Sequence, residues 1–160
     1  MHIRKAKIKD IEQIMLVFKD YEKASVGYLP AKYKSLRNKK KPFKKHLRKA
    51  LAKDIRQRNA CLLVAEEGGK VLGFIFGEIR DDKNLLFNRP KTGELYNLAV
   101  LKTHQGKGIA RMLWKGLRAW FAEKKCKMIT LSVNSNNRNA QEIYKRWGFD
   151  LFYLRMIRKV

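Results

Sequence analysis

The most constraining feature of the sequence is a strand-like segment that runs through two glycines directly into an amphipathic helix. Residues 94–101 are largely apolar and are predicted to form a buried strand. Over residues 107–124 the apolar side chains recur at helical spacing, namely Ile109, Met112, Leu113, Gly116, Leu117, Trp120 and Phe121. A helix that follows a strand this closely packs back on the sheet, so the sequence predicts an α/β fold.

Strands and helices alternate along the rest of the chain. The further predicted strands cover residues 1–7, 61–66, 70–80, 128–133 and 149–158, and the further helices cover residues 9–22, 43–58 and 137–147. Residues 23–42 are predicted to form a loop, and Gly68-Gly69 the turn of a hairpin. No internal repeat or Gly/Ser linker interrupts this order, which predicts a single domain over residues 1–160.

Positive charge is concentrated in one part of the chain. The 160 residues carry a formal charge of +24, and residues 31–60 hold 13 Lys and Arg against a single acid, Asp54. Such a cluster is typical of a docking surface for nucleic acid or an acidic protein, because clustered cations attract polyanions. The alternative is a solvated helix face with no dedicated partner.

Composition excludes several classes of protein. With 45% hydrophobic residues the chain has enough apolar material for a core, which rules out a disordered basic tail. No apolar run approaches the roughly 18 residues that span a bilayer, and the first residues lack a secretory signal, so we expect a cytoplasmic protein. Cys61 and Cys126 are predicted to be reduced. His2 and His46 have no other metal ligands at a suitable spacing, so no metal is expected, and His104 is expected to be a solvated loop residue.

The segment Gln105-Gly106-Lys107-Gly108-Ile109-Ala110 predicts an anion cradle. Glycines let a phosphate approach the backbone, and the first turn of the helix presents unpaired N–H groups at its positive end. A third glycine at the dinucleotide-binding spacing and the Gly-Lys-Ser/Thr ending of a P-loop are both missing. We therefore expect a ligand with a pyrophosphate that is bound neither as in a dinucleotide-binding fold nor as in a P-loop.

Three segments together resemble the GNAT superfamily of acyl-CoA-dependent N-acetyltransferases over essentially the whole chain. The cradle matches the family pattern Gln/Arg-x-x-Gly-x-Gly/Ala, which holds the pyrophosphate of CoA. The preceding Asn97-Leu98-Ala99-Val100 is similar to the fourth strand of the family, whose backbone pairs with the pantetheine arm. Asn137-x-x-Ala140-x-x-x-Tyr144-x-x-x-Gly148-Phe149 is similar to the C-terminal signature.

The resemblance implies a mixed, mostly antiparallel sheet splayed between its fourth and fifth strands, flanked by about four helices, with acetyl-CoA as co-substrate. The expected acetyl-CoA-binding residues are Leu98, Ala99, Val100, Gln105, Gly106, Lys107, Gly108, Ile109, Ala110, Arg111 and Asn137. Asn137 is also predicted to cap its helix, and Arg111 to add charge near the phosphates.

Two residues are candidates for proton transfer. The resemblance gives Tyr144 the role of general acid toward the thiolate, against the alternative of an aromatic ring that only packs. Some family members carry a Glu on the fifth strand, where this chain has Ser132. Glu94 is the candidate base, because strand parity predicts it on the face of Leu98 and Val100; the alternative is a Glu paired with a cation.

The sequence therefore predicts an N-acyltransferase that moves an acetyl group from acetyl-CoA to a primary amine by direct attack in a ternary complex. Because residues 31–60 repel polycations, the expected acceptor is an acidic small molecule, an amine of a protein in an acidic or nucleic-acid-bound partner, or an aminoacyl-tRNA. The alternative is a non-catalytic module of the same fold that senses acetyl-CoA or docks on nucleic acid.

Overall fold

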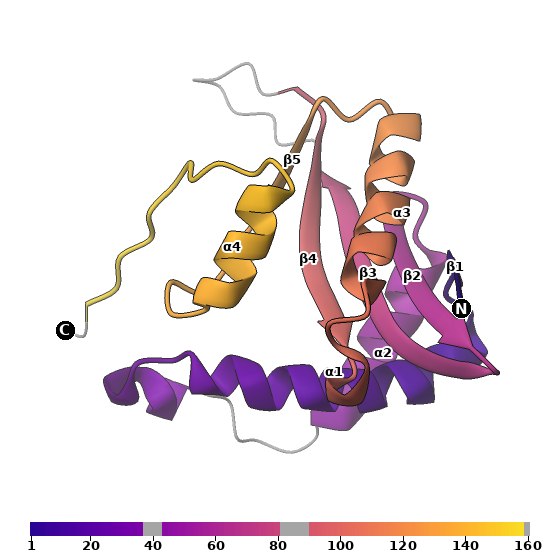
Figure 1. The fold of residues 1–160 in the computed structure, drawn as a ribbon, viewed down its shortest axis with the longest axis horizontal. Helices are drawn as coiled ribbons and strands as arrows, with labels where there is room; N and C mark the ends of the chain where they lie inside the picture. Colours follow the sequence, from indigo (N-terminus) through magenta and orange to yellow (C-terminus); the bar gives the residue numbers. More distant parts are fainter. Residues whose placement is uncertain (37–42, 81–89, 159–160) are drawn as a thin grey trace.

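A computed structural model of the protein describes residues 1–36, 43–80 and 90–158, which form a mixed sheet with helices on both faces (Figure 1). The strands are β1 (His2–Lys5), β2 (Ala60–Glu67), β3 (Lys70–Arg80), β4 (Thr92–Val100) and β5 (Met128–Leu131). The α-helices are α1 (Ile11–Gly27), α2 (Phe43–Arg56), α3 (Ile109–Glu123) and α4 (Arg138–Arg146). Short 3-10 helices are η1 (Ile8–Asp10), η2 (Ala31–Leu36) and η3 (Lys102–His104). In this described part no helix has the length and apolar character needed to cross a membrane.

The sheet has the strand order β1-β2-β3-β4-β5, so each strand lies beside the strand that follows it in the sequence. The first four strands run antiparallel to one another, and β5 pairs with β4 in parallel through the crossover α3. Gly68 and Gly69 turn β2 into β3 with φ of +55° and +76°, as a tight hairpin requires. The predicted mixed α/β sheet with its hairpin is confirmed.

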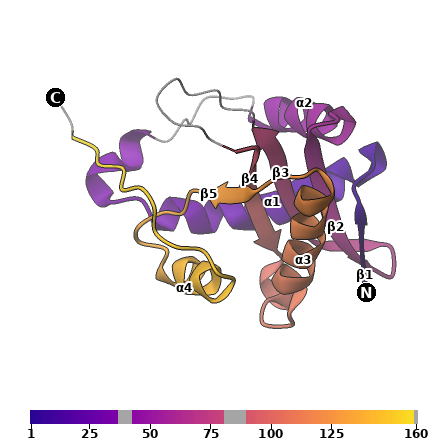
Figure 2. The ribbon, with the colours of Figure 1, turned by 90° about the horizontal axis from the view of Figure 1, so that it is seen from above.

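Each face of the sheet is covered by its own helices, with α2 and α3 on opposite sides (Figure 2). On the α3 side the core is formed by buried residues that include Leu113, Leu117, Phe121, Ile75 and Leu95. On the side of α1 and α2 the core is formed by buried residues that include Ile14, Val17, Leu51, Val64 and Phe74. The predicted amphipathic helices thus bury most of the stripes that their spacing indicates, while Met112 of α3 and Phe43 of α2 stay exposed.

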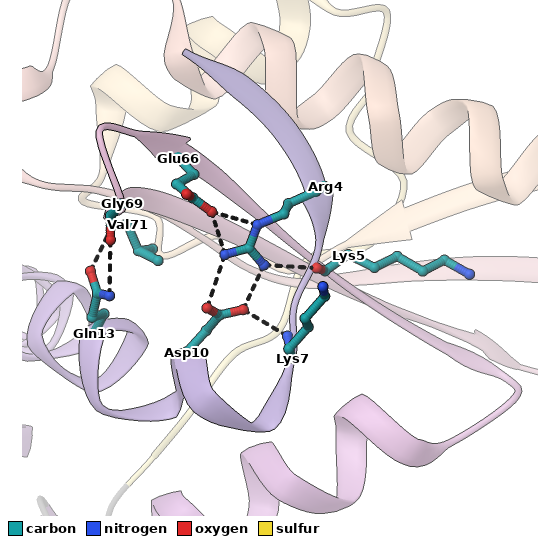
Figure 3. Close-up of polar contacts among 8 residues, drawn as sticks. All are labelled: Arg4, Lys5, Lys7, Asp10, Gln13, Glu66, Gly69 and Val71. Atoms are coloured by element: carbon teal, nitrogen blue, oxygen red, sulfur yellow. Dashed lines mark hydrogen bonds and ion pairs between the residues drawn. The ribbon is translucent and has the colours of Figure 1, made fainter.

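A partly buried ion network fixes the start of α1 against the sheet (Figure 3). Arg4 of β1 donates to both carboxylate oxygens of Asp10 at 2.6 and 2.9 Å and to Glu66 of β2 at 2.5 Å. These hydrogen bonds hold the pKa of Asp10 below its usual value, with a further contribution from the N–H of Lys7. Gln13 of α1 accepts from the N–H of Val71 at 2.8 Å, which ties the helix to the hairpin.

The structure differs from the predicted strand over residues 149–158 and from the predicted loop over residues 23–42. Residues 149–158 form no strand, because the N–H of Phe149 closes the last turn of α4 on the carbonyl of Tyr144, at 3.0 Å, and the chain then runs away from β5 (Figure 1). The predicted loop over residues 23–42 begins later, since α1 continues to Gly27, and η2 forms part of it. Its residues 37–42 lie outside the described chain.

Candidate functional site

The strands β4 and β5 pair along only part of their length. Their register runs from Thr92 opposite Met128 to Leu95 opposite Leu131 and ends there. Beyond Leu95, the part of β4 over residues 96–100 has no strand neighbour on that side within the described residues. The predicted splay between the fourth and fifth strands is thus present, and we call residues 96–100 the open edge of β4.

The backbone of Leu98 and Val100 faces this open edge. Leu101 donates its N–H to the carbonyl of Leu72 on β3 at 2.8 Å, and successive residues of a strand direct their backbone groups to opposite sides. Leu98 and Val100 therefore point N–H and C=O away from β3, whereas Ala99 points them toward β3 and has a buried side chain. An extended ligand along the open edge would meet the backbone of Leu98 and Val100.

The glycine segment after β4 has the conformation of a cradle. Gly106 and Gly108 have φ of +78° and +77°, in the left-handed region that favours glycine. An added Cβ at either position would meet open space, so the requirement here is backbone shape rather than packing. Gln105 donates its side-chain amide to the carbonyl of Val100 at 3.1 Å, which links the cradle to the open edge.

The first turn of α3 supplies the donors of the cradle. The first hydrogen bond within the helix runs from Met112 to the carbonyl of Gly108 at 3.1 Å, so the N–H groups of residues 109–111 precede it. The side chain of Ile109 is buried and anchors the turn, while Lys107 and Arg111 are exposed. Free N–H groups, the positive end of the helix and two cations fit a phosphate group.

Tyr144 lies in an aromatic setting on α4. Its ring meets those of Trp147 and Phe149 edge-on at 5.7 and 5.9 Å between centroids. Trp147 stacks in turn on Trp114 of α3 at 5.6 Å, which fixes α4 to the body of the protein. Burial raises the pKa of Tyr144 to about 12, and the neighbouring Tyr21 of α1 adds to the shift. The phenol is therefore protonated at neutral pH and available as a proton donor.

Asn137 caps α4, as predicted. Its side-chain oxygen accepts from the N–H of Ala140 at 3.2 Å, and its carbonyl accepts from the N–H of Gln141 at 3.1 Å. With the oxygen engaged in the cap, the NH₂ of Asn137 is the part of the side chain left to meet a ligand.

The predicted position of Glu94 needs a correction. Phe76 of β3 pairs with Asn97 while Gly77 pairs with Leu95, so Tyr96 is the extra residue of a β-bulge. The bulge breaks the alternation, and Leu95 joins Leu98 in the core under α3. Glu94 consequently lies on the opposite face, toward α1 and α2, and not on the face of Leu98 and Val100.

On that face Glu94 is paired with a cation. Arg80 at the end of β3 approaches a carboxylate oxygen of Glu94 at 2.8 Å, and the Glu94 side chain keeps 17% of its surface exposed. The guanidinium also lies over the ring of Tyr96, 5.9 Å from its centroid. The structure thus provides the ion pair that the alternative interpretation expects, and places the carboxylate at a solvent-accessible position beside β4.

Sequence reasoning missed two residues of this region. Tyr21 shares the α1 face of Ile14, at the i, i+7 spacing, which was a usable signal for its proximity to the sheet. Arg80 ends the strand that pairs with β4, and Glu78 lies directly opposite Glu94, so an antiparallel register would have placed the cation nearby.

The remaining candidate residues have other surroundings. Ser132 is exposed just beyond the end of β5, and the ring of His104 contacts the hydroxyl of Thr103 at 2.9 Å. Across residues 1–36, 43–80 and 90–158 no group of three His, Cys, Asp or Glu could hold a metal ion. Both cysteines are free, with Cys61 buried.

The described basic residues of segment 31–60 are exposed, namely Lys32, Lys34, Lys44, Lys45, Arg48, Lys49, Lys53, Arg56 and Arg58. Most of them lie on the outer side of α2, and we call these nine residues the basic face. Arg48 pairs with Glu12 of α1 at 2.7 Å. The other members of the predicted cluster, Arg37 and residues 39–41, lie outside the described chain.

Known proteins share both sequence and fold with this chain. "N-acetyltransferase 8F1" of Mus musculus is 26% identical over 118 residues, which are 69% of this chain and 52% of the mouse protein. An "Uncharacterized N-acetyltransferase" of Archaeoglobus fulgidus is 26% identical over 146 residues, covering 90% of this chain and 89% of its own. The chain spans about half or less of the length of the mouse protein and several other curated relatives.

The fold is shared with solved acetyltransferases. The structure of "Aminoglycoside N-Acetyltransferase AAC(6')-Iy in Complex with CoA" superposes with a TM-score of 0.71 at 16% identity and covers 99% of both chains. The model of the "Acetyltransferase (GNAT) family" matches residues 17–149, which include the open edge of β4, the cradle and Tyr144. The chain belongs to the acetyltransferase (GNAT) family.

Proposed function

We propose that this protein is an N-acetyltransferase that transfers the acetyl group of acetyl-CoA to a primary amine by direct attack in a ternary complex. The observation that carries the proposal is the continuity of the open edge of β4 with the cradle at the start of α3. Gln105 joins the two through its bond to Val100, so an extended arm and a pyrophosphate of one ligand would find adjacent places. Family membership supports the same ligand.

Each part of the site has one role in binding acetyl-CoA. The N–H groups of residues 109–111, with Gly106 and Gly108 and the cations of Lys107 and Arg111, would hold the pyrophosphate. The backbone of Leu98 and Val100 and the amide of Asn137 would bind the pantetheine arm. Acetyl-CoA itself supplies an acetyl group activated as a thioester.

The chain's own groups then position the reactants and move protons. The amine nitrogen forms a bond to the carbonyl carbon, the carbon–sulfur bond breaks, and the nitrogen loses a proton. An N–H of Leu98 or Val100 would stabilise the negative charge that develops on the carbonyl oxygen. Tyr144 would donate its hydroxyl proton to the departing sulfur, which leaves as the thiol of CoA.

Glu94 is the proposed acceptor of the amine proton, directly or through a water. Its place on the face of α1 and α2 supports this role, because the opposite face is filled by the core under α3. Arg80 is bound to the carboxylate, so an incoming ammonium group would compete with a guanidinium for Glu94. Glu94 would take the first proton from the bound ammonium group, and the neutral amine would then attack the thioester. The second proton that the nitrogen loses would restore the hydroxyl of Tyr144.

The acceptor class follows from charge. Helix α2, which carries most of the basic face, packs on the face of the sheet where Glu94 lies. The basic face would repel polycations such as polyamines and attract acidic molecules. We therefore propose an amine carried by an acidic or nucleic-acid-associated substrate. The proposal further includes a single domain over residues 1–160 and a cytoplasmic location, which the two free cysteines support.

Release of CoA thiol against an acceptor panel tests this function. The panel would contain amino acids, aminoglycosides, spermidine, acidic and basic peptides, charged tRNA and a ribosome fraction. The expected result is release above the acceptor-free rate with an acidic or nucleic-acid-associated amine. A clear preference for spermidine would refute the charge argument, and binding of acetyl-CoA without release from any acceptor would favour the non-catalytic module.

A further inference from the structure

The ion pair of Arg80 and Glu94 lies at the start of the open edge of β4. Arg80 is the last residue of β3, Glu94 belongs to β4, and Tyr96 is the first residue of the open edge. The guanidinium approaches the carboxylate at 2.8 Å and lies 5.9 Å from the centroid of the Tyr96 ring. A positive and a negative charge thus stand together beside the edge along which acetyl-CoA is proposed to bind.

The surroundings position the guanidinium and leave the ion pair accessible. The ring of Tyr96 stacks on that of Phe76, with 5.7 Å between centroids and 25° between planes, which fixes the surface on which the guanidinium lies. The side chain of Arg80 is 47% exposed and that of Glu94 is 17% exposed. A ligand that comes from solvent therefore reaches both charges without a change in the sheet.

A lone ammonium group would meet two opposite effects at this ion pair. The carboxylate of Glu94 would attract it, as the proposed acceptor of its proton. The guanidinium of Arg80, which lies 2.8 Å from the same carboxylate, would repel it, because two positive charges at such short range raise the energy of the complex. A negatively charged group on the acceptor, placed next to Arg80, would offset this repulsion.

A carboxylate beside the amine supplies that negative charge. A guanidinium carries five N–H donors in a planar fork, so it can bind a second carboxylate while it keeps the first. With the ammonium beside Glu94 and the carboxylate beside Arg80, four charges of alternating sign form a ring. On the basis of the acetyl transfer proposed above, we propose that the acceptor is a small molecule whose reacting primary amine lies next to a carboxylate, as in an α-amino acid, and that Arg80 binds this carboxylate.

The dimensions of an α-amino acid suit such a ring. Its amine and its carboxylate are attached to one carbon atom, so their charges lie about as close together as those of Arg80 and Glu94. A polyamine would bring a second cation toward Arg80 in place of an anion. An acidic side chain on the amino acid would in addition be attracted by the basic face.

Comparison of amino acids with their α-carboxamides tests the role of the adjacent carboxylate. The probes are serine, leucine, phenylalanine and glutamate, each paired with the α-carboxamide that keeps the amine and the side chain. Isothermal titration in the presence of CoA gives each Kd without turnover, and thiol release from acetyl-CoA gives kcat/KM. We expect at least one amino acid to bind at least about tenfold more tightly than its carboxamide. An adjacent carboxylate raises the pKa of the amine, so this preference cannot come from a larger share of neutral amine.

The variant Arg80→Gln separates recognition of the carboxylate from a structural effect. It is expected to bind the amino acid at least about tenfold more weakly and the carboxamide at least as tightly as the wild type does. Attraction of the carboxylate and repulsion of the ammonium are lost together, whereas a damaged fold would weaken both ligands. The control is Arg118→Gln, the same change at an exposed arginine of α3, and it is expected to keep the wild-type ratio of the two Kd values.

Equal Kd values for every amino acid and its carboxamide, or a preference for the amino acid that Arg80→Gln retains, would overturn the role of Arg80. Thiol release with amines that lack an adjacent carboxylate, and with none of the four amino acids, would overturn the acceptor class and leave the proposed acetyl transfer standing. A binding preference that Arg80→Gln abolishes, without thiol release from any acceptor, would support the amino-acid site and refute the acetyl transfer.

Discussion

Tyr144 is the side chain on which the proposed chemistry most depends. Tyr144→Phe keeps the ring contacts with Trp147 and Phe149 and removes only the hydroxyl. We expect kcat to fall by about 10²- to 10⁴-fold, the usual contribution of a positioned general acid, with little change in KM. Initial rates of thiol release measure this. The control is Tyr153→Phe, at an exposed tyrosine after α4. Unchanged turnover in Tyr144→Phe would reduce Tyr144 to a packing role.

The raised pKa of Tyr144 has its own consequence at high pH. The phenol ionises near pH 10 when unfolded and at about 12 when folded, so both states are protonated below pH 10 and the stability contribution is intact there. Between pH 10 and 12 only the unfolded state ionises, and the free energy of unfolding falls. We expect urea unfolding to show a smaller fall in Tyr144→Phe than in the wild type; equal falls would contradict the shift.

Substitution of Glu94 tests whether this residue accepts a proton or only forms the ion pair with Arg80. We expect Glu94→Gln to lower kcat/KM by about 10²-fold, because the amide accepts no proton. Glu78→Gln is the matched control, since Glu78 lies opposite Glu94 and binds Asn59 at 2.9 Å. If Glu94→Gln and Glu78→Gln have the same kcat/KM, Glu94 serves only as a structural ion pair.

At the scale of elements, the cradle depends on backbone shape. Gly108→Ala places a Cβ on a residue with φ of +77°, which costs about 1 kcal/mol and disturbs the start of α3. We expect the Kd for acetyl-CoA to rise at least about tenfold, as about 1.4 kcal/mol of lost phosphate contacts implies. Isothermal titration measures it.

The hairpin offers a control with the same backbone strain. Gly69 has φ of +76° and equally open surroundings, at the β2–β3 turn away from the cradle. Gly69→Ala should lose similar stability and leave the Kd unchanged. If Gly108→Ala and the wild type bind acetyl-CoA with equal affinity, the cradle does not take part in binding it.

Elements whose signal is local could be predicted from the sequence, and those that depend on pairing could not. The helical spacing from Ile109 to Phe121 fixed α3 to within two residues at its start, and Gly68-Gly69 located the hairpin. The bulge at Tyr96 is a property of the β3–β4 register and is invisible in the alternation of one strand, so the face of Glu94 was wrongly predicted. Residues 149–158 have strand-like composition, but a strand needs a partner that local pattern does not reveal.

At the scale of the whole molecule, the basic face predicts where a polyanion binds. We expect the triple variant Lys44→Gln/Lys45→Gln/Lys49→Gln to weaken binding of single-stranded RNA and to reduce the slope of log K against log salt by about 2. Fluorescence anisotropy at several salt concentrations measures both. The control is Lys115→Gln/Arg118→Gln/Lys127→Gln, three exposed cations in and after α3. Equal losses in the two variants would show that net charge, and not the basic face, attracts the RNA.

The central claim is that one ligand, acetyl-CoA, occupies both the open edge of β4 and the cradle. Titration of the ¹⁵N-labelled protein with acetyl-CoA, followed by amide chemical shifts, tests this residue by residue. We expect the largest shifts at the amides of Leu98, Val100, Gly106, Gly108 and residues 109–111, while Gly68 and Gly69 at the hairpin stay unchanged. Shifts confined to the basic face, or no saturable shift at the open edge and cradle, would contradict the claim.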